Sequence, residues 1–196
     1  FPLPVGGKDN GRTASRVCRH KDTAMLLDIV TYPDPRLKEV CAPIQEITED
    51  IRRLAADMLE TMYAAPGVGL AAPQVGRNIR MLVMDPSVQD GEKNPRVLIN
   101  PVLALSGEEV RSEAEGCLSV PMNYRADVKR MSKVRLTATD LDGKRIEEDR
   151  EDFPAIVLQH EYDHLDGILF IDKISRLRRS LYDSKVKKWL KRKTAA

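Results

Sequence analysis

The chain has 196 residues, 42% of them hydrophobic, and a formal net charge of +2 at pH 7. This length predicts one domain with tails, and no stretch approaches the ~18–20 consecutive apolar residues that span a membrane, so no membrane partner is expected. Three cysteines without framework spacing argue against a disulfide-built secreted domain and leave thiols free to bind a metal.

The charge is unevenly distributed along the chain. Residues 173–196 hold ten Lys or Arg and one Asp, and residues 1–24 hold five basic and two acidic residues, which leaves −10 for residues 25–172. The more common role of such a basic tail is a solvated helix face. If the tail has a partner, its charge predicts a polyanion.

Residues 1–24 are basic, rich in Gly and without apolar periodicity, so we expect them to lie outside the core as a leader or an artificial extension. Met25 opens the apolar segment MLLDIVTYPDPRL and is the expected natural start. A remnant of an organelle transit peptide is the alternative for the leader. Residues 25–172 are then the predicted catalytic domain, and residues 173–196 a basic helix or tail.

The first predicted helix begins after Thr48, its expected N-cap, and ends near Ala64. It is predicted from apolar residues at intervals of three, four and four, namely Ile51, Leu54, Met58 and Met62.

Strands are predicted in the middle of the chain. The segment PGVGLAAPQVG at 66–76 is too rich in Gly and Pro for regular helix, whereas residues 80–84 and 96–100 have the pattern of buried strands, the second stopped by Pro101. Apolar residues then alternate with polar ones at 134–138, and Asp142-Gly143 predicts a hairpin turn into another polar strand.

A second helix is expected from Asp152 and Pro154 to a stop at Gly167, which puts QHEYDHLDG on a helix of about twelve residues. A last helix is predicted in the basic tail, with its apolar face at Ile174, Leu177 and Leu181. The predicted class is α+β: short, mostly antiparallel strands around the central H-E-x-x-H helix, with an N-terminal amphipathic helix and a basic C-terminal helix.

His160 and His164 can bind one metal ion, because residues four apart lie on the same face of a helix. Glu161 is rotated by about 100° from His160, so it is better suited to take a proton from a water at an open metal position than to be a ligand. The alternative is a solvated helix that carries these residues by chance.

The residues alone leave the third ligand open. Phe170 stands where one class of zinc proteases has a third His, and no Glu follows Glu161 as another class requires. A thiolate suits iron or zinc, although a lone Cys is more often a small buried apolar residue. The candidates are an unspecified Asp, His20, Cys18, Cys41 and Cys117.

Three motifs together resemble the peptide deformylase family: GVGLAAPQVG at 67–76, EGCLS at 115–119 and QHEYDHLDG at 159–167. The resemblance covers about residues 25–175. It implies a metallohydrolase that removes the formyl group from the N-terminal formyl-methionine of new proteins and releases formate. It makes Cys117, His160 and His164 the ligands of one divalent ion, with Fe²⁺ the native metal and Zn²⁺, Ni²⁺ or Co²⁺ able to replace it.

The resemblance also assigns roles around the metal. Glu161 carries the proton, while the Gln74 amide and the Leu118 backbone N–H stabilise the negative oxygen that forms at the formyl carbon. The residues expected to contact the N-formylmethionyl peptide are Val68, Gly69, Glu115, Gly116, Phe153, Ile156 and Val157, the last three lining the methionine pocket. Glu115 is expected near the pocket rim, paired to an arginine that the sequence does not identify.

The implied partners follow from this substrate. The basic C-terminal helix is expected to bind the ribosome near the exit tunnel, in the bacterial cytoplasm, or in an organelle if the leader is a transit-peptide remnant; no DNA partner is expected. Two other classes remain as alternatives: a metallohydrolase with another substrate, and a non-catalytic protein with a structural metal. The open fourth metal position and the free Glu161 argue against the second.

Overall fold

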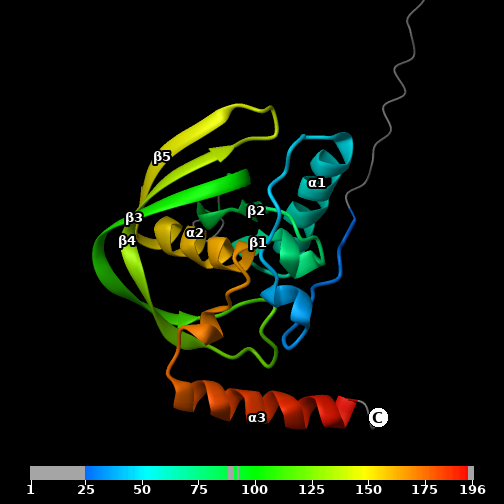
Figure 1. Ribbon diagram of the computed structural model, residues 1–196, viewed down its shortest axis with the longest axis vertical. Coiled ribbons are helices and arrows are strands. Elements are labelled where there is room, and N and C mark those ends of the chain that lie inside the picture. The colour runs from blue at the N-terminus through cyan, green and yellow to red at the C-terminus, as the bar shows by residue number, and fades with distance from the viewer. Residues whose placement is uncertain (1–24, 88–90, 92, 194–196) are drawn as a thin grey trace, which may run out of the picture.

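The computed structural model describes residues 25–87, 91 and 93–193. Its sheet is antiparallel, with strands in the order β1-β2-β3-β4-β5, and it curves around α2, while α1 and α3 lie outside it; the α+β class is confirmed (Figure 1). The leader, residues 1–24, lies outside the described residues. The elements are β1 Gly69–Ala71, β2 Met81–Met84, β3 Arg96–Glu115, β4 Ala126–Thr139, β5 Arg145–Glu151, α1 Glu49–Ala64, α2 Asp152–Leu165 and α3 Arg176–Lys193.

Helix α1 forms where the apolar spacing predicts it. The Thr48 hydroxyl accepts a hydrogen bond from the Ile51 N–H at 3.4 Å, which satisfies one of the free donors of the first turn. Met58 and Met62 are fully buried in a core cluster that also contains β2 residues. Burial of this apolar face holds the helix against the sheet, because a helix of this length is marginal by itself.

Strand β3 corrects two sequence expectations, the stop at Pro101 and the shortness of the strands. It runs for 20 residues, straight through Pro101. The register with β4 shifts between Ile99 and Val102, and Asn100 has a φ of 49°. This irregularity removes the need for a backbone donor at Pro101, and the Asn100 side chain bonds both the N–H and the C=O of Ile44.

The β4–β5 hairpin agrees with the alternation in the sequence. Val134, Leu136 and Ala138 are each at most 3% exposed, and they face a core cluster shared with α2. Gly143 adopts a φ of 79° in the turn, a conformation that glycine takes without steric cost. Helix α2 lies against the sheet at the centre of the molecule (Figure 1). The sheet therefore holds the side chains of α2 in fixed positions.

Helix α3 forms in the basic tail, but its predicted apolar face is only partly right: Ile174, just before the helix, packs against a core cluster, whereas the two leucines do not. Leu177 and Leu181 are 71% and 58% exposed, whereas Tyr182 and Val186 are buried. The Tyr182 ring stacks on Tyr124 at a centroid distance of 4.3 Å, and its hydroxyl donates to the Pro121 carbonyl at 3.1 Å. A tyrosine is buried readily when its hydroxyl finds a partner. The contacts of Tyr182 therefore determine which face of α3 packs against the core. No helix formed by the described residues is long and apolar enough to cross a membrane.

Candidate metal centre

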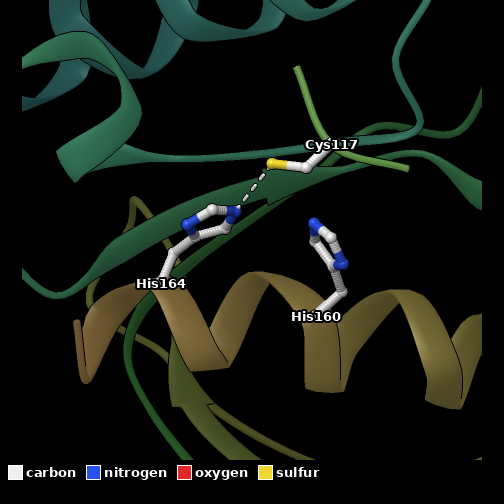
Figure 2. Close-up of side chains that lie close together, drawn as sticks. All are labelled: Cys117, His160 and His164. Carbon is white, nitrogen blue, oxygen red and sulfur yellow. Dashed lines mark hydrogen bonds between the residues drawn. The ribbon is translucent and has the colours of Figure 1, made fainter. Parts of the chain in front are cut away.

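Cys117, His160 and His164 come together beside α2 (Figure 2). One ligand atom of each residue lies within 4.8 Å of the others, and Cys117 Sγ is 3.2 Å from His164 Nε2. The two histidines project from the same face of α2, and Cys117 reaches them from the turn that follows β3 (Figure 2). Of the candidates for a third ligand that the structure describes, Cys117 is therefore the one that the fold brings to the histidine pair; His20 and Cys18 lie outside the described residues.

The cluster fits a divalent transition metal. A thiolate and two imidazoles are a donor set used by iron and zinc, and three protein ligands leave one position open, as catalytic sites do. Cys41 takes no part; it is 3% exposed in another core cluster, and burial raises the pKa of its thiol to about 11.

A buried charge network holds His160 in place. His160 Nδ1 lies 2.7 Å from Glu115 Oε1, and Arg130 donates to both Glu115 oxygens at 2.5 and 3.1 Å. Arg130 also donates to Asp163 at 2.5 Å. Such a carboxylate orients a ligand imidazole and leaves its other nitrogen for the metal.

Arg130 is the arginine that the sequence did not identify. It lies on the buried face of β4, the same face as Val128 two residues earlier, and only 3% of it is exposed. A charged residue on the buried side of an alternating strand was the available signal. Glu115 lines the substrate cavity, but Arg130 and His160 already engage its carboxylate.

The charges of the network set the protonation of its members. Burial opposes ionisation of Glu115, but hydrogen bonds from His160 and Arg130 outweigh it and lower its pKa to about 2. Burial also disfavours a charged His160, yet its contacts with Cys117 and Glu115 raise its pKa well above the ordinary value. Burial and the charge on His160 keep the pKa of His164 well below its ordinary value, which leaves a neutral imidazole able to donate a lone pair.

Glu161 follows His160 on α2 and is 4% exposed. Its Oε2 atom has no hydrogen-bond partner among the described residues, and burial raises its pKa to about 7. A carboxyl group with a pKa near 7 exchanges protons readily at neutral pH. Glu161 lines the same cavity as Cys117 and His160, so a proton-exchanging carboxyl group borders the cavity that two of the metal ligands line.

Gln74 is held in a fixed orientation next to Cys117. Its Oε1 accepts from the Ala71 N–H at 2.8 Å, and its Nε2 donates to Ser119 Oγ at 3.2 Å and Cys117 Sγ at 3.4 Å. The acceptor role toward Ala71 fixes which amide atom faces the site. Ser119 is fully buried and was not singled out from the sequence.

A cavity of about 480 Å³ opens beside the cluster. All but one of the thirteen residues selected from the sequence line it; the exception, His164, is 1% exposed behind the cavity wall. Those that line it are Val68, Gly69, Gln74, Glu115, Gly116, Cys117, Leu118, Phe153, Ile156, Val157, His160 and Glu161. More of its wall is formed by Pro121, Met122, Asn123, Tyr124 and Arg125, none of which was selected from the sequence.

Comparison with known proteins agrees with this site. The family model for polypeptide deformylase matches residues 26–180. A peptide deformylase of Alkalilimnicola ehrlichii is 50% identical over 163 residues, which is 83% of this chain and 90% of that protein.

Solved structures agree as well. A Legionella pneumophila peptide deformylase has a TM-score of 0.78 and 40% identity, over 87% of this chain and 99% of that one. A Met-Ala-Ser-bound class I type b peptide deformylase of Acinetobacter baumannii has a TM-score of 0.71 and 36% identity, over 77% and 99%. The chain belongs to the polypeptide deformylase family.

Proposed function

We propose that this protein is a peptide deformylase whose Cys117, His160 and His164 hold the catalytic metal and whose Glu161 moves the proton. It would hydrolyse the formyl amide of an N-formylmethionyl peptide and release formate. The observation that carries this proposal is the buried Glu161 carboxyl group, whose Oε2 has no partner among the described residues and which lines the same cavity as Cys117 and His160. A structural metal site has no use for such a group.

The proton steps follow from the place of Glu161. A bound divalent ion would supply Lewis acidity, which lowers the pKa of a water and polarises a carbonyl. Glu161 accepts the proton of the water that attacks the formyl carbon, and it returns that proton to the methionine nitrogen as the C–N bond breaks. Burial raises the pKa of the Glu161 carboxyl to about 7, so the group can both take and release a proton near neutral pH.

Two donors would stabilise the oxygen that becomes negative at the formyl carbon. Gln74 Nε2 faces the site because Ala71 and Ser119 hold its amide. Its second N–H, which donates to Cys117 Sγ at 3.4 Å, would turn to the new oxygen. The Leu118 backbone N–H makes no hydrogen bond with any described residue, so it is free to donate. Preorganised donors of this kind are each worth about 10²–10³ in rate.

The peptide would bind as an added strand. β1 is the edge strand of the sheet, so Val68 and Gly69 can pair with an extended peptide on one side while Gly116 pairs on the other. Phe153, Ile156 and Val157 on the first turns of α2 give the cavity an apolar wall for the methionine side chain. A similar deformylase crystallised with Met-Ala-Ser supports this peptide class. We propose a positioning role for Glu115 rather than direct contact with the peptide.

Formate release from formyl-Met-Ala-Ser tests the proposal. We expect turnover by the metal-loaded protein, no cleavage of internal peptide bonds, and a loss of about 10²–10⁴-fold in Glu161→Gln with metal content unchanged. Full activity in that variant would refute the role of Glu161. Cleavage within the peptide would instead indicate a protease.

For the native metal we propose Fe²⁺, with Zn²⁺, Ni²⁺ or Co²⁺ as substitutes. The donor set suits both iron and zinc, so the choice needs a measurement. Anaerobic purification followed by metal analysis should find iron, and activity should fall on exposure to air while a nickel-loaded sample stays active. A zinc content equal to the protein concentration under anaerobic conditions, with full activity, would contradict this.

We further propose that α3 docks on the ribosome near the exit tunnel, in the bacterial cytoplasm. The supporting features are the ten Lys and Arg of residues 173–196 and the exposure of Lys187 and Lys188. Deletion of α3 would remove buried Tyr182 from the core, so reversal of the Lys187 and Lys188 charges is the cleaner test. We expect cosedimentation with ribosomes at low salt that high salt and this reversal abolish; equal binding by the variant would end the idea.

A further inference from the structure

A second groove continues from the catalytic cavity toward α3. It has a volume of about 380 Å³ and lies between the start of β4 and α3, where Figure 1 shows α3 running beneath the β3–β4 connection. Ala114, Tyr124 and Arg125 line both the groove and the catalytic cavity. These three residues form a shared rim, so a peptide that leaves the cavity across them would reach the groove.

The groove is positively charged. Arg125, Arg178 and Lys185 line it, against the single carboxylate of Asp127. That carboxylate is already engaged, because it accepts from the Ala114 N–H at 3.0 Å and from the Arg111 guanidinium at 3.0 Å. These bonds and nearby positive charges lower the pKa of Asp127. Its carboxylate therefore stays ionised and remains hydrogen-bonded to Ala114 and Arg111.

The three cations lack such partners. Within the described part of the chain, Arg125, Arg178 and Lys185 form no ion pair, and Arg125 donates only to the Ala114 carbonyl, at 3.2 Å. Three unpaired cations in one groove repel one another, and an anionic ligand would relieve that repulsion.

The floor of the groove is apolar and rigid. Leu181, from the exposed side of α3, is 58% exposed and lines the groove. Tyr182 lies beside it and is fixed by its stack on Tyr124 and its bond to Pro121. A fixed apolar floor with cations along it is suited to the backbone and acidic side chains of a peptide.

We propose that this groove binds the substrate residues beyond the third, and that it favours Asp and Glu among them. Each extended residue advances the chain by about 3.3 Å, so a few residues reach past the rim. Arg178 and Lys185 on α3 are then specificity determinants that act on the Michaelis complex and do not touch the reacting atoms. This inference rests on the proposed deformylase function.

Four C-terminally amidated substrates test the groove: formyl-Met-Ala-Ser, and the same peptide followed by three Asp, three Ser or three Lys. At low salt we expect the Asp peptide to have a KM about three- to tenfold below that of the Ser peptide, as suits a few partly exposed ion pairs. The Lys peptide should have a higher KM, kcat should be equal for all, and salt should remove the differences.

The double variant Arg178→Glu/Lys185→Glu should abolish or invert the preference and leave the tripeptide unaffected. Both side chains are exposed, and an unchanged tripeptide rate verifies the fold. Lys188→Glu, an exposed position of α3 that does not line the groove, is the matched control and should behave as wild type.

Three results would overturn the inference: no Asp preference in the wild type, an Asp preference that survives in the double variant, or an equal loss in Lys188→Glu. The last would show that the overall charge of α3 attracts the peptide. Failure of the proposed function itself would be a different result, the absence of formate release from every peptide including formyl-Met-Ala-Ser.

Discussion

The backbone of Gly69 lies directly against the side chain of Glu161. A Cβ atom on Gly69 would lie 2.7 Å from both Cγ and Cδ of Glu161, a separation that real Cβ atoms do not sustain. β1 therefore passes the proposed proton carrier at a distance that only glycine permits. This contact gives a physical reason for glycine at position 69, the second glycine of the GVGLAAPQVG segment.

Gly69→Ala is expected to displace Glu161 and leave the fold intact, because the clash involves the outer part of a flexible side chain. A misplacement of about 1 Å at a catalytic group costs about 10²-fold in rate. We therefore expect formate release to fall by about that factor, with little change in the thermal unfolding temperature.

The matched control for Gly69→Ala is the same substitution in Glu161→Gln. If alanine acts through Glu161, it adds little to the loss already caused by the glutamine, since coupled sites are not additive. A full further loss in the double variant would show that alanine acts by another route, such as impaired pairing of β1 with the peptide.

Thiol labelling distinguishes Cys117 from Cys41. With a pKa of about 11 and 3% exposure, Cys41 has about one thiolate per thousand molecules at pH 8 and little access to reagents. In a Cys18→Ser protein stripped of metal, we expect iodoacetamide to modify Cys117 far faster than Cys41, and metal to protect Cys117. Equal labelling of both, or no protection, would contradict the proposed ligand.

Arg130 is expected to be essential for stability. Its side chain is 1% exposed between Glu115 and Asp163. Arg130→Ala therefore leaves the buried Glu115 carboxylate without its arginine, whereas Asp163 keeps its ion pair with Lys173. Loss of one partner of a buried pair costs about 3–5 kcal/mol, measured by urea unfolding. Arg135→Ala on the same strand, where the ion pair with Asp149 is 68% exposed on both sides, should cost about 0–1 kcal/mol. Similar losses in the two variants would refute the difference.

The two faces of α3 predict different stabilities for neighbouring residues. Tyr182→Ala removes a ring that is 1% exposed, and we expect destabilisation of about 3–5 kcal/mol, as for other buried aromatic residues. Leu181→Ala changes an exposed side chain and should stay within about 0.5 kcal/mol. The reverse order, measured by thermal unfolding, would restore the helix face predicted from the sequence.

The sequence by itself determined the features that depend on neighbouring residues. The Thr48 cap, the spacing of apolar residues in α1, the alternation in β4 and the Asp142-Gly143 turn each reflect interactions within a few positions. The same holds for His160 and His164, because a helix alone puts residues four apart on one face. The three motifs at 67–76, 115–119 and 159–167, taken together, also indicated the family.

Only the tertiary structure decided which distant groups meet. From the residues alone the third ligand was open, and it is the packing of the turn after β3 over α2 that brings Cys117 to within 3.2 Å of His164. The same packing pairs Glu115 with Arg130, and the β3–β4 irregularity lets a strand continue through Pro101. The inward face of α3 follows from the fit of Tyr182 against Tyr124. These outcomes depend on burial and partners far apart in the chain, which local periodicity does not encode.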